Sequence, residues 1–109
     1  MKTAVFALAL LPFPAQAELQ MITARYLCER GVEVPVAYVN ADGDGVVTLT
    51  VDGSQISLYQ EPSASGARYG WPSDGSNYVW WSKGDAATLY WKNQTGAETP
   101  LLSDCKQQM

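Results

Sequence analysis

The stretch VVTLTVDGSQISLYQ, residues 46–60, contains two short segments on either side of Asp52-Gly53. Both segments are rich in β-branched and aromatic residues that alternate with polar ones, a pattern typical of strands with one buried face. An Asp-Gly pair between two such segments is one of the strongest short-range hairpin signals, because the tight turn needs positive φ angles. This stretch therefore predicts an antiparallel strand pair.

The same pattern recurs on both sides of this hairpin. Upstream, RYLCER carries strand-like alternation, and in VEVPVAYV alternation places Val32, Val34, Val36 and Tyr38 on one face; NADGDG follows as a turn. Pro35 faces the other way, which indicates an edge or a bulge. Downstream, polar and glycine-containing connections separate four more candidate strands, RYGW, NYVWWS, AATLYW and LLSDC.

This spacing predicts an all-β domain of about eight short strands, either a meandering antiparallel barrel or a small sandwich. We favour the closed barrel, because closure leaves no exposed strand edge. A barrel of this size is filled by its own side chains. We expect most of the following aromatic residues to lie inside: Tyr26, Tyr38, Tyr59, Tyr69, Tyr78, Trp80 and Trp91.

The N-terminal residues 1–17 read as a secretory signal peptide. Lys2 precedes an apolar segment over residues 4–11, and the small-residue triplet Ala15, Gln16, Ala17 follows a proline break. We expect cleavage after Ala17 and a single mature domain over residues 18–109 that resides in the periplasm or is secreted. No cysteine stands at the cleavage point, so no lipid anchor is expected.

Two cysteines, Cys28 and Cys105, lie near the two ends of the expected mature chain. Because an exported chain meets an oxidising compartment, the simple reading is one disulfide that joins the terminal strands. A small domain benefits from such a covalent link. The alternative is a pair of free buried thiols.

The chain has 7 basic and 11 acidic residues, for a net charge of −4, which becomes −5 once Lys2 is removed. An acidic chain without a basic stripe is not expected to bind nucleic acid or anionic membranes, and it favours a cationic partner. Histidine is absent, which removes the usual general base and the commonest transition-metal ligand. No cofactor or metal is expected: NADGDG begins like a calcium loop, but Val51 occupies the position that needs glutamate.

Two segments do not suit an ordinary loop or strand end. SASGARY, residues 63–69, combines small residues with a glycine, which allows close approach to another surface. YVWWSKG, residues 78–84, ends an aromatic strand on Lys83. A lysine at this position also has an ordinary explanation, because charged residues at strand ends prevent edge-to-edge pairing.

Together these segments resemble the two signature motifs, SGxxY and YxxxTKG, of the bacterial inhibitors of C-type lysozymes. That family is known in membrane-bound and periplasmic forms, and the periplasmic form is the more similar one. Ser82 replaces the threonine of the second motif and keeps its hydroxyl group. The matched residues, which the resemblance implies as lysozyme-binding, are Ser65, Gly66, Arg68, Tyr69, Tyr78, Ser82, Lys83 and Gly84.

The resemblance implies an inhibitor rather than an enzyme, with a β-barrel that plugs the substrate cleft of a C-type lysozyme. Ser65 and Lys83 match the family positions that engage the catalytic carboxyl groups. Two other hypotheses remain at this point: a periplasmic barrel that carries a small apolar ligand, and a hydrolase with a Ser65–Lys83 catalytic pair. The sequence is compatible with a monomer or a homodimer.

Overall fold

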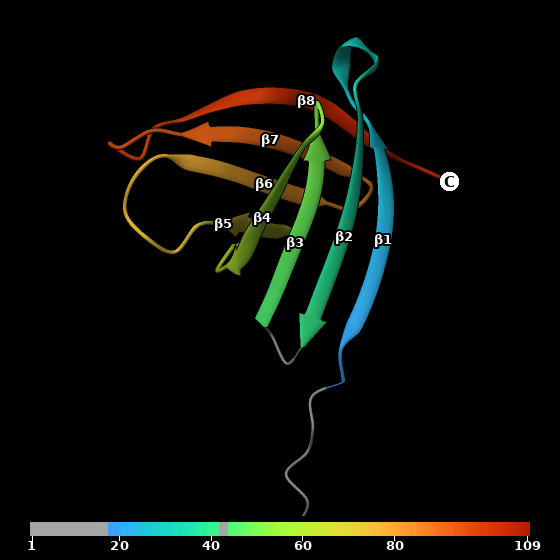
Figure 1. The fold of residues 1–109 in the computed structure, drawn as a ribbon, viewed down its shortest axis with the longest axis horizontal. Coiled ribbons are helices and arrows are strands. Elements are labelled where there is room, and N and C mark those ends of the chain that lie inside the picture. The colour runs from blue at the N-terminus through green and yellow to red at the C-terminus, as the bar shows by residue number, and fades with distance from the viewer. Residues whose placement is uncertain (1–17, 42–43) are drawn as a thin grey trace, which may run out of the picture.

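The computed structural model describes residues 18–41 and 44–109, which form eight strands and one 3-10 turn, η1 at Glu29–Gly31 (Figure 1). The predicted signal peptide and its cleavage point lie outside the described residues. The strands are β1 at Gln20–Leu27, β2 at Glu33–Ala41, β3 at Asp44–Val51, β4 at Ser54–Glu61, β5 at Ala67–Gly70, β6 at Asn77–Lys83, β7 at Ala86–Lys92 and β8 at Glu98–Gln108.

The strands form a closed antiparallel barrel in chain order, as predicted. In Figure 1, β1 to β3 run across the direction of β6 to β8, because the strong twist of a small barrel rotates successive strands. The barrel closes where Arg25–Leu27 of β1 pair with Lys106–Gln108 of β8. None of the helical structure within residues 18–41 and 44–109 has the length and apolar character needed to cross a membrane.

The predicted hairpin at Asp52-Gly53 is confirmed. Val51 pairs with Ser54, so the turn contains only Asp52 and Gly53, whose φ angles are 49° and 79°. The alternation of the second strand is also confirmed, since Val34 and Val36 are buried in β2. Pro35 pairs with Arg25 of β1, but β2 pairs with β3 only from Val36 onward. Pro35 therefore lies where that side of β2 has no partner in the ladder, as the edge prediction requires.

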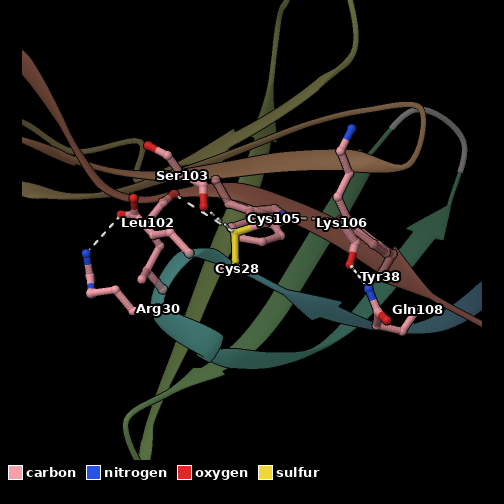
Figure 2. Close-up of a disulfide and its surroundings, with 10 residues drawn as sticks. Cys28, Arg30, Tyr38, Leu102, Ser103, Cys105, Lys106 and Gln108 are labelled. Atoms are coloured by element: carbon pink, nitrogen blue, oxygen red, sulfur yellow. Dashed lines mark hydrogen bonds and ion pairs between the residues drawn. A yellow bond between two sulfur atoms is a disulfide. The ribbon is translucent and has the colours of Figure 1, made fainter.

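The predicted disulfide joins Cys28 to Cys105 (Figure 2). Cys28 directly follows β1, and Cys105 lies on β8, so the bridge connects the two strands that close the barrel. The first strand was expected to include Cys28 and the residues after it. Instead β1 ends at Leu27, because Arg30 and Gly31 adopt positive φ angles of 59° and 71° in the turn that follows.

The barrel interior is filled by apolar side chains, of which Trp80, Leu49 and Leu58 are among the largest that are fully buried. The Tyr38 hydroxyl lies 2.9 Å from the Tyr26 hydroxyl and accepts a hydrogen bond of 2.9 Å from Nε1 of Trp80. Tyr26 and Trp80 also pack edge to face, with ring centroids 5.2 Å apart. Burial raises the pKa of Tyr26 well above its usual range, and the hydrogen bond with Tyr38 adds to the shift.

Two aromatic residues expected inside the barrel are largely exposed instead. Tyr59 is 50% exposed and packs against Trp71, and Trp91 is 37% exposed and packs edge to face against Tyr78. The prediction was wrong for Tyr59 because alternation with buried Leu58 places it on the outward face of β4. Trp91 shares the face of buried Leu89, but it pairs with Tyr78 near the end of β7, where its ring remains partly exposed. Tyr26, Tyr69 and Trp80 are buried as predicted, and Tyr38 and Tyr78 are partly buried against the core.

Candidate functional site

The two motif segments meet at one end of the β5–β6 strand pair. Ala67 of β5 pairs with Ser82 of β6, so Gly66 and Lys83 face each other just beyond this pair. A Cβ atom built on Gly66 would lie 3.1 Å from the Cβ of Lys83. Ser65 and Lys83 are both exposed. The pairing therefore presents a serine-bearing loop and a lysine side by side at the surface.

Gly66 is required at this position for two reasons. Its φ angle is +67°, a left-handed conformation that side chains rarely adopt. A Cβ atom there would also lie only 2.5 Å from the carbonyl oxygen of Ser82. Glycine therefore allows the loop after β4 to lie directly against the end of β6.

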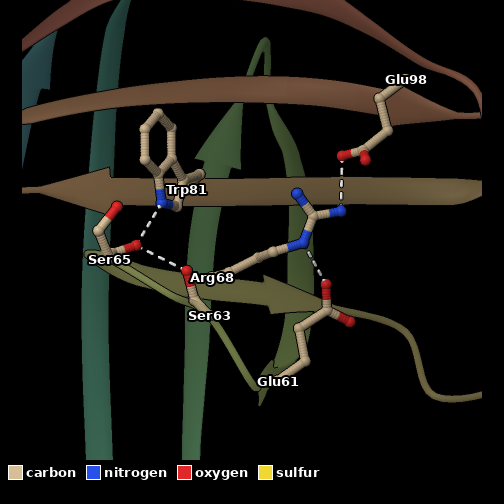
Figure 3. Close-up of polar contacts among 6 residues, drawn as sticks. All are labelled: Glu61, Ser63, Ser65, Arg68, Trp81 and Glu98. Carbon is tan, nitrogen blue, oxygen red and sulfur yellow. Dashed lines mark hydrogen bonds and ion pairs between the residues drawn. The ribbon is translucent and has the colours of Figure 1, made fainter.

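The Ser65 backbone carbonyl accepts two hydrogen bonds (Figure 3). The Ser63 hydroxyl donates one at 2.6 Å, and Nε1 of Trp81 donates the other at 3.0 Å. The Ser65 hydroxyl takes part in neither bond, and no hydrogen bond within the described residues engages it. The loop thus has a fixed backbone and a side-chain hydroxyl that is available to a partner.

Lys83 takes part in no salt bridge within residues 18–41 and 44–109. It is the last residue of β6 and pairs with Ala86, so only Gly84 and Asp85 form the turn to β7. Gly84 has a φ angle of +60° and open space around it. Ser82 is half-buried, and its hydroxyl makes only a long hydrogen bond of 3.5 Å to the carbonyl of Ala67.

Arg68 points along the outer face of the barrel and is held by two carboxylates (Figure 3). Its Nε atom lies 2.5 Å from Oε1 of Glu61, and its Nη2 atom lies 2.6 Å from Oε1 of Glu98. Burial alone would lower the pKa of Arg68, but the hydrogen bonds to these carboxylates raise it above its ordinary value. Through these two ion pairs Arg68 braces β5 against Glu61 of β4 and Glu98 of β8.

The two motif tyrosines lie away from Ser65 and Lys83. Tyr69 is 3% exposed and contacts Tyr38 inside the barrel, and its burial raises its pKa. Tyr78 is half-buried at the start of β6, where it packs against Trp91. The structure therefore brings together Ser65, Gly66, Ser82, Lys83 and Gly84, whereas these two tyrosines anchor their strands.

The sequence reasoning missed Ser63 and Trp81 as parts of this site. Ser63 carried a local signal, because serine hydroxyls often bond to backbone groups two residues away. Trp81 carried no local sequence signal, because its contact with Ser65 depends on the pairing of β5 with β6. Glu98 likewise meets Arg68 across a sequence separation of 30 residues.

Neither alternative function is supported by this geometry. The filled interior counts against a carrier of small apolar ligands, for which an internal cavity is needed. No hydrogen bond joins Ser65 to Lys83 within the described part of the chain, as a catalytic pair would require. The same residues contain no group of three or more histidine, cysteine or acidic residues placed to bind a metal, and Asp42 of the calcium-like sequence lies outside them.

Comparison with known proteins points to one family. The family model for "Membrane-bound lysozyme-inhibitor of c-type lysozyme" matches residues 26–98. Relatives that carry this same name occur in Pseudomonas aeruginosa, with 36% identity over 89% of this chain and 73% of the relative, and in Escherichia coli, with 36% identity over 83% and 72%. A relative from Cupriavidus necator is 34% identical over 75% of this chain, which spans only 62% of that protein.

Two solved structures with this fold are of lysozyme inhibitors. The Pseudomonas aeruginosa protein MliC, solved in complex with hen egg white lysozyme, superposes with a TM-score of 0.65 at 31% identity, over 90% of this chain and 92% of MliC. PliC-St, the periplasmic inhibitor of C-type lysozyme from Salmonella typhimurium, also gives a TM-score of 0.65, at 26% identity over 84% of this chain and 100% of PliC-St. The relatives are inhibitors rather than enzymes. From its family match, its relatives and its barrel, the chain belongs to the family of membrane-bound lysozyme inhibitors of C-type lysozyme.

Proposed function

We propose that this protein inhibits a C-type lysozyme by inserting Ser65 and Lys83 into the active-site cleft of that enzyme. One observation carries the proposal: the β5–β6 pairing presents an exposed serine loop beside an exposed lysine that has no salt bridge in the described structure. The relative of known structure that was solved with hen egg white lysozyme supports the choice of partner.

The chemistry of the target suits these two side chains. A retaining glycosidase works with two carboxyl groups about 5 Å apart, one protonated and one ionised. The Ser65 hydroxyl can donate to a carboxylate or accept from a carboxylic acid. The Lys83 ammonium can form a charge-assisted hydrogen bond, which is stronger in a desolvated cleft than at a surface. The pair can therefore satisfy both carboxyl groups while it excludes the sugar and water.

The rigidity of the site supports tight binding. Gly66 lies against β6, and Arg68 connects β5 to carboxylates of β4 and β8. A loop that is ordered before binding loses less conformational entropy when it enters the cleft. The β-barrel thus acts as a stiff support for a small inserted surface.

We further propose that the protein acts in the periplasm, as its N-terminal sequence and the periplasmic member of its family suggest. There it would meet a lysozyme that crosses the outer envelope. The net charge, −4 for the full chain and −5 once Lys2 is removed, favours encounter with a cationic enzyme. This electrostatic attraction acts at long range and speeds association. Inhibition itself comes from the insertion of Ser65 and Lys83.

The test is an assay of bacterial cell-wall lysis by hen egg white lysozyme with purified inhibitor. Combining Ser65→Ala with Lys83→Ala should abolish inhibition and leave the thermal unfolding transition in place. The matched control combines Ser73→Ala with Lys92→Ala, a serine and a lysine that line one depression at the opposite end of β6 and β7. Unchanged inhibition by the first variant, or equal loss in both, would refute the proposed site.

A further inference from the structure

We propose that Ser63 and Trp81 are positioning residues that hold the Ser65 loop in its inhibitory conformation before lysozyme binds. The inference rests on the proposed function and deepens it. Neither residue occupies a defined position of the SGxxY or YxxxTKG motif. Both nevertheless bond to one atom, the carbonyl oxygen of Ser65, at 2.6 Å and 3.0 Å.

The two donors belong to different segments of the chain. Ser63 belongs to the loop itself, two residues before Ser65, and closes a local turn. Trp81 belongs to β6, where it pairs with Arg68 of β5. The Ser65 carbonyl is therefore fixed both within its own loop and to the neighbouring strand (Figure 3).

Trp81 also connects the two inhibitory side chains. It stands two residues before Lys83 on the same strand, so its ring is attached to the backbone that carries the lysine. Its Nε1 atom would lie 3.0 Å from a Cβ atom built on Gly66, which shows that the indole lies directly against the loop backbone. The indole thus sets the position of Ser65 relative to Lys83.

Holding the Ser65 carbonyl affects lysozyme binding because it limits the positions that the Ser65 hydroxyl can occupy. With its carbonyl held, Ser65 keeps mainly the rotation about χ1, so its hydroxyl samples few positions. If the hydrogen bonds are removed, the loop populates the competent conformation for only part of the time. The apparent affinity falls in proportion to that population, although no contact with lysozyme has been removed.

A direct contact with lysozyme is the competing explanation for an effect of Ser63 or Trp81. The two explanations differ in the free protein. A positioning residue changes the order of the loop when no lysozyme is present, whereas a contact residue does not. Inhibition alone cannot separate them, so the experiment needs a second measurement.

The experiment uses Trp81→Phe, which removes the indole N–H and keeps an aromatic ring. Trp91→Phe is the control, because Trp91 is partly exposed and contacts Tyr78 rather than the loop. We expect Trp81→Phe to lower the ¹⁵N order parameter of the Gly66 amide in the free protein. We also expect it to weaken inhibition of hen egg white lysozyme by about three- to tenfold, the range for loss of one hydrogen bond.

Ser63 supplies an independent variant in an exposed loop. Ser63→Ala should produce the same two changes. Ser63→Thr keeps the hydroxyl, so it should retain the wild-type Gly66 order parameter and the wild-type inhibition. Weaker inhibition with an unchanged Gly66 order parameter would overturn the proposal in favour of direct contact. Unchanged inhibition despite a mobile loop would overturn it as well. A wild-type protein that does not inhibit lysozyme would instead refute the proposed function, and the order parameter would still report on the loop.

Discussion

Gly66 and Lys83 lie against each other across the end of the β5–β6 pair, so that a Cβ atom on Gly66 would lie 3.1 Å from the Cβ of Lys83. The same added atom would lie 2.5 Å from the carbonyl oxygen of Ser82. Because of this close approach, the backbone of the Ser65 loop and the end of β6 form one continuous surface. The close approach also makes the site sensitive to a single added methyl group.

We predict that Gly66→Ala weakens lysozyme inhibition and destabilises the fold by about 1 to 3 kcal/mol, because it combines φ strain with a steric clash. Gly31→Ala is the matched control, since Gly31 has a φ angle of +71° and nothing within 4 Å of the added Cβ position. Denaturant unfolding and an inhibition assay measure the two effects. Full inhibition by Gly66→Ala would show that the close approach is not needed.

Lys83 should contribute a large part of the binding free energy, because its charge enters a desolvated cleft. We predict that Lys83→Met reduces affinity for hen egg white lysozyme by about 2 to 5 kcal/mol, which corresponds to at least about 30-fold. Calorimetric titration measures this change, with Lys92→Met as the control at the other end of the strand pair. A loss of less than about threefold would mean that Lys83 remains solvated in the complex.

The Arg68 brace should stabilise the barrel more than an exposed ion pair does. Arg68→Met leaves Glu61 and Glu98 without their partner in a half-buried setting, and we predict a loss of about 1 to 2 kcal/mol in the free energy of unfolding. Arg30→Met removes an exposed pair with Glu29 and should change stability by less than about 0.5 kcal/mol. Equal unfolding midpoints for the two variants would contradict the bracing role.

The raised pKa of Tyr26 predicts a loss of stability at alkaline pH. The folded state favours the neutral phenol, so its contribution is complete below the ordinary tyrosine pKa of about 10 and decreases as the pH rises through that value. Chemical unfolding between about pH 8 and about pH 11 should show this decrease, and Tyr26→Phe should reduce its slope. A Tyr26→Phe slope equal to that of the wild type would contradict the prediction.

The disulfide should stabilise the fold through the long loop that it closes, with 77 residues of sequence separation. Replacing both Cys28 and Cys105 by serine should lower the free energy of unfolding by about 4 kcal/mol, as chain-entropy estimates give for such a loop. Thermal unfolding measures the change. A reducing agent should affect the wild-type protein but not the double variant, and an unaltered wild-type transition would show that the bridge is not structural.

The sequence alone was sufficient to predict about eight short strands and to favour a barrel over a sandwich, because the signals for the strands are local. Asp52-Gly53 specified a hairpin through its positive φ angles, and the alternation in residues 32–39 identified the buried face of β2. The cysteine pair was also predictable from composition and position. Family membership could be inferred from the two motifs, because their spacing is preserved within single segments.

Tertiary structure decided how the site is held together. Which rings cover Tyr59 and Trp91, which carboxylates hold Arg68, and which group fixes the Ser65 carbonyl all depended on contacts between different segments of the chain. Local alternation determines which residues share a face of a strand, but not which neighbouring strand lies beside them. Barrel closure and strand register set those contacts, and for this reason Trp81 became part of the site only when β5 paired with β6.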